Sequence, residues 1–118
     1  MAIKTSTLAE GIGLIEARGT FSGGDETIAL RQAVAGFVEQ DYQKMIIDLT
    51  NTTYINSTAL GILVAAHTTY TKKGWKVKIC GVNNNVNNIF VITRLSLVFD
   101  VFETQKQAVE SFAESTPV

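Results

Sequence analysis

Hydrophobic positions along the chain change their spacing several times, and each spacing indicates one kind of element. Residues 3–9 and 13–18 are two short, apolar-rich runs on either side of Glu10-Gly11, a pattern that predicts a β-hairpin. After it, apolar positions repeat at helical spacing, and two carboxylates suit the first turn of that helix. These positions are Asp25 and Glu26, then Leu30, Ala33, Val34, Phe37 and Val38. The first part of the chain therefore predicts two strands followed by one helix.

The middle of the chain predicts strand, helix and strand. The run from Met45 to Leu49 is apolar almost without interruption, which indicates a central strand buried on both faces. A polar stretch, predicted to be a loop, leads into a helix from about Ser57 to Lys73, which Gly74 is expected to end. Residues 75–80 alternate as in a half-buried strand. One face of this predicted strand carries the apolar residues Trp75, Val77 and Ile79, and the other face carries Lys76 and Lys78.

The last third continues the alternation of helices and strands. A short helix is predicted around Val86–Thr93, a strand over Val98–Phe102, and a final helix opened by the capping-box pattern Thr104–Gln107. This order predicts an α/β fold with a mostly parallel sheet of about five strands, crossover helices and an antiparallel first strand. Because one domain typically takes ~100–150 residues, residues 1–118 are expected to form a single domain.

Composition narrows the class of protein. The chain is 46% hydrophobic and 18% charged, which is typical of a folded protein. Ten basic residues against eleven acidic ones leave no basic stripe for phosphates, so nucleic acid is not an expected partner. The single cysteine favours a reducing compartment, and the N-terminus lacks a signal-peptide pattern. Apolar runs such as Leu60–Ala66 are far shorter than the ~20 residues of a membrane span. We expect a cytoplasmic protein that does not span a membrane.

Motifs for catalysis, cofactors and metals are missing from the sequence. There is no phosphate-binding loop, no G-x-S-x-G elbow and no C-x-x-C pair. The only histidine, His67, falls on the apolar stripe of its predicted helix, and Cys80 ends an apolar strand, so both are expected to be structural. We therefore expect no enzymatic activity, no cofactor and no metal.

The most informative stretch is Asp48–Gly61, which leads from the buried strand into the longest predicted helix. Its hydroxyl and amide side chains gather where the first backbone N–H groups of a helix lack partners. Asn56, Ser57 or Thr58 could accept a hydrogen bond there as an N-cap and contribute ~1 kcal/mol. This pattern alone is explained by capping, and it leaves open a second role for a hydroxyl exposed at a helix N-terminus.

The same stretch resembles the signature of STAS domains, and specifically of bacterial anti-sigma factor antagonists. That signature is similar to Asp-Leu-Ser-Gly-Val-x-Phe-x-Asp-Ser-Ser-Gly-Leu-Gly. It is matched without a gap, identically or by close replacement, at Asp48, Leu49, Thr50, Ile55, Ser57, Thr58, Leu60 and Gly61. Residues 95–102 also resemble a late Leu-x-x-x-Phe-x-x-Phe segment of the family. The resemblance covers nearly the whole chain.

The resemblance implies a regulator of transcription that switches partners. In the family, the unphosphorylated antagonist binds an anti-sigma factor with serine/threonine kinase activity and so frees a sigma factor. Phosphorylation ends this binding, and a serine phosphatase restores it. The resemblance implies Thr58 as the phosphoacceptor, with Ser57 as the less favoured choice, in a monomer or weak dimer. The implied partner-binding residues are Asn56, Ser57, Thr58, Ala59, Gly61 and Ile62.

Three departures from the family pattern leave alternatives open. Asn56 stands at the usual Asp, Thr58 at the more common Ser and Ala59 at the usual Gly, which is compatible with a domain that binds without being switched. A second interpretation is an accessory STAS subunit of a lipid or anion transport system. The asparagine-rich run Asn83–Asn88 is interpreted as a solvated loop and helix start, or as a neutral contact surface beside the predicted helix that begins at about Ser57.

Overall fold

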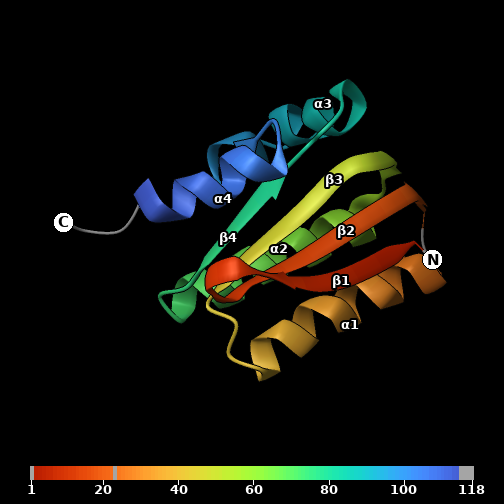
Figure 1. Cartoon of the computed structure of the whole chain (residues 1–118). Helices are drawn as coiled ribbons and strands as arrows, with labels where there is room; N and C mark the ends of the chain where they lie inside the picture. The colour runs from red at the N-terminus through yellow and green to blue at the C-terminus, as the bar shows by residue number, and fades with distance from the viewer. Residues whose placement is uncertain (1, 23, 115–118) are drawn as a thin grey trace.

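The chain folds around a five-stranded mixed sheet. The computed structural model describes residues 2–22 and 24–114. The strands lie in sequence order, the first pair antiparallel and every later pair parallel (Figure 1). They are β1 (Ile3–Leu8), β2 (Ile12–Phe21), β3 (Lys44–Ile55), β4 (Lys76–Cys80) and β5 (Asp100–Phe102). This confirms the predicted α/β fold with an antiparallel first strand.

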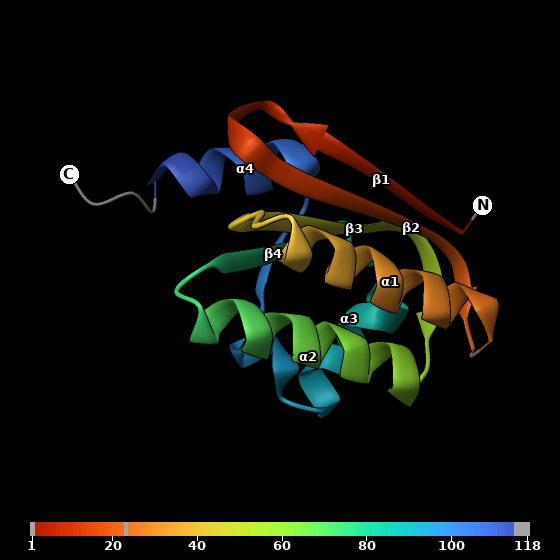
Figure 2. The same ribbon diagram turned by 90° about the horizontal axis from the view of Figure 1, so that it is seen from below.

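Helices cover the two faces of the sheet unequally. They are α1 (Asp25–Glu39), α2 (Ser57–Lys72), α3 (Asn84–Ile92) and α4 (Gln105–Glu114), with 3-10 turns η1 (Ala9–Gly11) and η2 (Leu95–Leu97). The first three helices contribute to the larger hydrophobic core on one face, while α4 closes a smaller core on the other face (Figure 2). Every residue from Met45 to Leu49 is buried between these layers, as predicted for a central strand.

Residues 50–55 form the second half of β3, so the predicted polar loop is wrong there. They pair with the last residues of β2 across two register shifts. The polar side chains serve this pairing: the Thr20 and Thr53 hydroxyls are 2.9 Å apart, and the Thr52 hydroxyl donates to the Ala17 carbonyl at 3.0 Å. Threonine is β-branched and favours extended backbone, so a polar run can continue a strand.

The last strand is also shorter than predicted. β5 covers only Asp100–Phe102, because Leu95–Leu97 forms a 3-10 turn and the Phe99 N–H donates back to the Leu95 carbonyl at 2.9 Å. The remaining helices and strands lie close to their predicted ranges.

Candidate functional site

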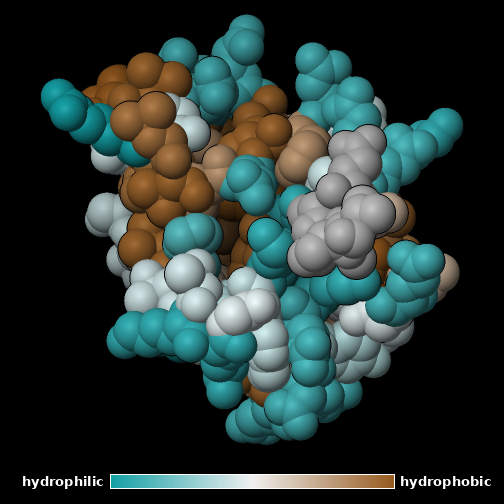
Figure 3. Space-filling model, turned by 90° about the vertical axis from the view of Figure 1, so that its left-hand side faces the viewer, coloured by the Kyte–Doolittle hydropathy of each residue, from teal (hydrophilic) through white to brown (hydrophobic). Residues whose placement is uncertain are grey.

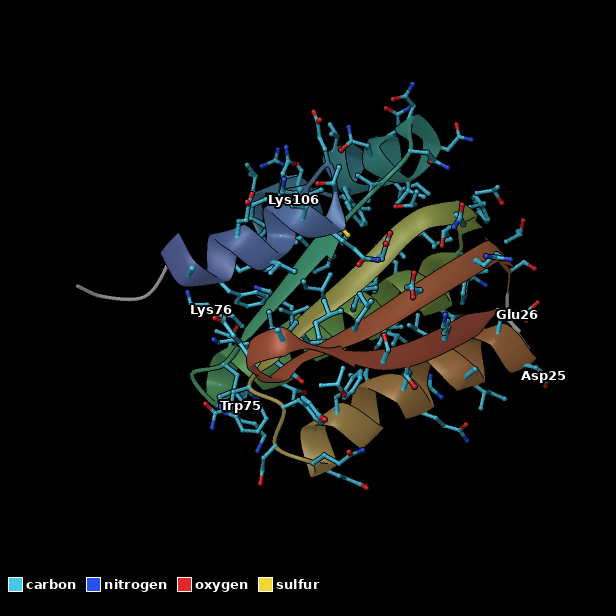
Figure 4. All side chains as sticks on the ribbon, in the orientation of Figure 1. Asp25, Glu26, Trp75, Lys76 and Lys106 are labelled. Atoms are coloured by element: carbon cyan, nitrogen blue, oxygen red, sulfur yellow. The ribbon has the colours of Figure 1, made fainter. Side chains whose placement is uncertain are left out.

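Three helices on one face of the sheet follow the carboxyl ends of its parallel strands. β2, β3 and β4 run parallel, and their carboxyl ends lead into α1, α2 and α3. The N-termini of α1 and α2 lie at the same end of the molecule (Figure 2). The labelled Asp25 and Glu26 mark this end, whereas Trp75 and Lys76 lie at the opposite end (Figure 4). Ligands and partners of parallel α/β sheets commonly bind outside the carboxyl ends of the strands.

Asn56 is the N-cap of α2. Its Oδ1 accepts a hydrogen bond from the Ala59 N–H at 2.9 Å, and its backbone is extended. Its own N–H donates to the Phe21 carbonyl at 2.8 Å, which fixes the start of the helix against the end of β2. Of the three side chains predicted as possible caps, Asn56 is therefore the one that caps α2.

Ser57 and Thr58 occupy the first two positions of α2, and both side chains are exposed. The Thr58 hydroxyl makes no hydrogen bond with another residue that the structure describes. The backbone N–H groups of these two residues lack intrahelical acceptors, as the first amides of any helix do. An exposed hydroxyl therefore sits beside free amide donors at the positive end of the α2 dipole.

The next turn of α2 alternates between buried and open positions. Ala59 is fully buried and Ile62 is 6% exposed, so both hold the helix against the core and offer little surface to a partner. Gly61 faces solvent, and a Cβ added there would meet nothing within 4 Å. Of the partner-binding residues implied by the sequence, the exposed surface comprises Ser57, Thr58 and Gly61, beside the half-buried Asn56.

Asn83 connects α3 to this site, a role that the sequence analysis missed. Its Oδ1 accepts from the Val86 N–H at 2.8 Å as the N-cap of α3, and its Nδ2 donates to the Thr52 carbonyl at 2.9 Å. A further contact of 3.4 Å reaches the Thr53 carbonyl. The signal was present in the sequence, because an asparagine three residues before a buried valine is an N-cap pattern.

Asp48, the first residue of the signature, lies on the α4 side of the sheet, away from α2. Its carboxylate accepts hydrogen bonds from the Thr50 N–H at 2.8 Å and from Gln105 Nε2 at 2.6 Å. It thus links β3 to the start of α4. Burial, helped by the negative charge of Asp48, raises the pKa of the neighbouring Cys80 thiol to about 12. These residues support the fold and do not form part of the exposed site.

The two other groups considered in the sequence analysis, His67 and Cys80, are packed into the structure. His67 is half-buried and packs edge-to-face on Phe99, with ring centroids 5.9 Å apart. Cys80 is buried and free. Residues 2–22 and 24–114 contain no group of three potential metal ligands. In the same ranges no helix combines the length and hydropathy needed to cross a membrane.

Several large apolar side chains are exposed on α3 and the turn that follows it. Ile92 and Leu97 are more than four-fifths exposed. Figure 3 shows hydrophobic side chains gathered on this side of the molecule, at its upper left. The exposed members are Val91, Ile92, Leu97 and Val98. Exposed apolar patches often mark surfaces that contact other molecules.

The fold is shared with anti-sigma factor antagonists of known structure. A Thermotoga maritima protein assigned to that class superposes with a TM-score of 0.84 at 16% identity, covering 92% of each chain. The antagonist SpoIIAA in its unphosphorylated form gives a TM-score of 0.77 at 8% identity, over 98% of this chain and 100% of that one. The phosphorylated form of SpoIIAA, from Bacillus, gives 0.77 at 11% identity, over 94% and 99%.

The sequence itself carries the family's features across most of its length. No curated protein sequence matches the chain. Residues 8–108 match the family model of the STAS domain, a range that runs from the end of β1 into α4. This match includes the whole of the α2 N-terminus described above. The chain therefore belongs to the STAS domain family.

Proposed function

We propose that this chain is an anti-sigma factor antagonist that is switched at Thr58. In this proposal the unphosphorylated chain binds an anti-sigma factor with serine/threonine kinase activity and so frees a sigma factor. The observation that carries it is the exposed Thr58 hydroxyl, which takes no part in capping because Asn56 provides the cap. The structural likeness to SpoIIAA, which is known in unphosphorylated and phosphorylated forms, also supports this proposal.

The folded chain can accept a phosphate at Thr58. A phosphothreonine carries about −1.5 to −2 charges at pH 7. The free N–H groups of Ser57 and Thr58 and the dipole of α2 favour an anion at this position. No side-chain hydrogen bond of Thr58 with a described residue has to be broken to place it there. Phosphorylation should therefore leave the fold and its stability nearly unchanged.

The same phosphate should weaken the binding of a docked partner. The phosphate would have to lose its water at the interface or face acidic groups of the partner. A loss of 10³-fold in affinity needs only ~4 kcal/mol, which one desolvated and unpaired double charge can exceed. Asp25 and Glu26 already lie at this end of the molecule, so a phosphate at Thr58 would add to the acidic charges there (Figure 4).

Gly61 supports a partner surface on α2. A glycine inside a helix costs ~0.5–1 kcal/mol relative to alanine. The fold does not require it, since a Cβ would enter open space. A partner that approaches the helix backbone closely would require it. The proposed contact surface is therefore Asn56, Ser57, Thr58 and Gly61, with Ala59 and Ile62 buried behind it.

In this proposal the chain is a binding module and a kinase substrate without catalytic activity of its own. A serine phosphatase would remove the phosphate and restore binding. Because sigma factors act on RNA polymerase, the proposal places the chain in the cytoplasm.

Phosphate mapping tests the identity of the acceptor. The chain is incubated with ATP and each histidine-kinase-like anti-sigma factor of its own organism, and the product is mapped by mass spectrometry. Phosphate is expected on Thr58 and is expected to be absent from Thr58→Ala. Ser57→Ala is the matched control and should still accept phosphate. Modification that persists in Thr58→Ala would contradict the assignment.

Binding measurements test the switch. Thr58→Asp should weaken the complex with the anti-sigma factor at least tenfold, whereas Thr58→Asn, of equal size without the charge, should bind close to wild type. Gly61→Ala should weaken the complex while raising the free energy of unfolding by ~0.5–1 kcal/mol. If Thr58→Asp binds as tightly as wild type, the charge does not control binding and the switch proposal fails.

An accessory role in transport is the second candidate. A protein of the sulfate transporter family from Wolinella succinogenes has the same fold, with a TM-score of 0.71 at 14% identity over 90% of this chain and 88% of that chain. Affinity capture separates the two functions. Recovery of a transport protein or its ATPase, with no kinase-type anti-sigma factor, would favour the transport role.

A further inference from the structure

The outer edge of β1 carries unpaired backbone groups. β1 lies at one end of the strand order, and in residues 2–22 and 24–114 only β2 pairs with it. It pairs over all six residues with no register shift. The opposite edge strand, β5, has only three residues. The sheet therefore has one long, regular free edge and one short one.

The hydrogen-bond pattern shows which residues of β1 face outward. The Arg18 N–H donates to the Ala2 carbonyl at 2.8 Å, so Ala2 lies in a hydrogen-bonded pair with β2. Such pairs alternate along an antiparallel ladder. Lys4, Ser6 and Leu8 therefore direct their N–H and C=O groups toward β2. The outward groups belong to Ile3, Thr5 and Thr7.

This edge has one of the features that usually prevent strands from pairing and lacks the others. Proteins protect free edges with prolines, bulges, charged side chains such as lysine, or very short strands. β1, with the sequence IKTSTL, has no proline and a single charge, Lys4. Its register with β2 is continuous, so no bulge turns it away. Two of its three outward residues are threonines, which favour strand pairing.

We infer that two copies of this chain associate through β1 in an antiparallel pair with its two-fold axis at Thr5. In this register Ile3 faces Thr7 of the second copy and Thr5 faces Thr5. Each of these hydrogen-bonded pairs exchanges two bonds, which gives about six in total. Lys4 then stands opposite Ser6. A register shifted to pair Ile3 with Thr5 would place Lys4 opposite Lys4, which like charges disfavour.

The association leaves the proposed switch accessible. β1 is separated from β3, and hence from the strand that leads into α2, by β2. The two sheets would join into one continuous sheet with a Thr58 on each half. The net charge of −1 per chain gives little long-range repulsion between the copies. The dimer therefore goes beyond the proposed function and does not depend on it.

Sedimentation equilibrium on the full chain tests the dimer. Wild type is expected to shift with concentration from 12.8 kDa toward twice that mass. Thr5→Pro removes an outward donor without touching the β1–β2 ladder and should raise the dissociation constant about tenfold or more, since two interface hydrogen bonds are lost. Thr5→Lys sets like charges face to face and should weaken the dimer as well, which keeps the test valid if the proline variant does not fold. Thr5→Val keeps the donor and the β-branch and should dimerise like wild type.

Amide exchange tests the register. In the dimer the amides of Ile3, Thr5 and Thr7 should gain protection as concentration rises, while those of Lys4, Ser6 and Leu8 should be protected at all concentrations. A chain that stays monomeric up to about 1 mM overturns the inference. So does a dimer that is unchanged in both Thr5→Pro and Thr5→Lys, which would use another surface. Protection that arises only when an anti-sigma factor is added would assign the edge to that partner and refute a second copy as its occupant.

Discussion

Replacing the cap of α2 should separate the residue that stabilises the helix from the residue proposed to be modified. Asn56→Ala removes the acceptor of the Ala59 N–H, a bond of 2.9 Å. The backbone bond from Asn56 to Phe21 is unaffected because it does not involve the side chain. Loss of an N-cap costs ~0.5–2 kcal/mol. Because Ala59 is fully buried, its amide is poorly placed to find water instead, and we expect about 1–2 kcal/mol.

Thr58→Ala, unlike Asn56→Ala, should not lower the free energy of unfolding. The Thr58 side chain is exposed and makes no hydrogen bond with a described residue. Alanine is also the better helix former, so the free energy of unfolding should stay constant or rise by a few tenths of a kcal/mol. Asn56→Asp should retain wild-type stability, because a carboxylate also caps and suits the helix dipole.

Urea unfolding monitored by circular dichroism measures the free energy of unfolding of all three variants, and thermal unfolding measures their Tm. For 118 residues, ~2.1 cal/mol/K per residue makes 1 kcal/mol equivalent to ~4 °C in Tm, so Asn56→Ala should melt about 4–8 °C lower. The slope of free energy against urea should be unchanged, since the extent of unfolding is the same. If Thr58→Ala costs as much as Asn56→Ala, the hydroxyl shares in the cap, and the separation of the two roles is refuted.

Three further predictions concern buried and partly buried residues. Gly81→Ala should cost more than ~2 kcal/mol in urea unfolding, because Gly81 has φ +76° and a Cβ would lie 2.9 Å from the Thr50 backbone; a loss within error would contradict this. Tyr70→Phe should leave stability equal or raise it by up to ~1 kcal/mol, since the buried Tyr70 hydroxyl has no partner among the described residues; a clear loss would reveal a partner. Burial raises the pKa of Cys80 from 9.0 to about 12 and that of Tyr70 from 10.0 to about 12, so the folded chain holds protons that the unfolded chain releases. The free energy of unfolding should therefore fall as pH rises from 9.0 to about 12, and Cys80→Ala should remove the part of the fall that begins near pH 9.0.

The order of elements could be predicted because each has a clear hydrophobic period. The continuous run Met45–Leu49 and the helical stripe of α1 follow directly from burial on two faces and on one face. The polar half of β3 could not be recognised in this way. Thr50–Ile55 is held in the sheet by its pairing with the end of β2, a partner some thirty residues earlier that local composition does not identify. Tertiary pairing overrode the loop-like composition.

The alternation of apolar residues and lysines in β4 predicted correctly which residues share a face of the strand. It did not predict which of the lysines are exposed. The lysines at 76 and 78 do lie on one face of the strand, opposite Val77 and Ile79. Only Lys76 is exposed, because α4 covers Lys78, which is 4% exposed. Its ammonium lies 4.9 Å from the centroid of the Phe112 ring and 3.8 Å from Asp100. Those partners come from later elements, so their contact could not be inferred from the strand itself.

The sequence indicated three possible caps at the start of one helix, but it did not show which of them caps the helix. Asn56, Ser57 and Thr58 all carry oxygen acceptors at the start of one helix, and any of them could cap it. The choice depends on where the helix begins, which is fixed by the bond from the Asn56 N–H to the end of β2. Asn83, which joins α3 to the Thr52 carbonyl, depends in the same way on a strand end distant in sequence.

Because the cap and the proposed phosphoacceptor are different residues, a modification can control binding without controlling folding. A phosphate on a capping side chain would change the group that accepts the first-turn N–H, so binding and stability would change together. Here Asn56 holds the helix start through its side chain and its backbone, and the exposed Thr58 stands two residues beyond it. The asparagine that replaces the family's usual aspartate keeps the cap while adding no charge. A phosphate at Thr58 would thus be the first negative charge in the opening turn of α2, and it would face a partner without removing the cap.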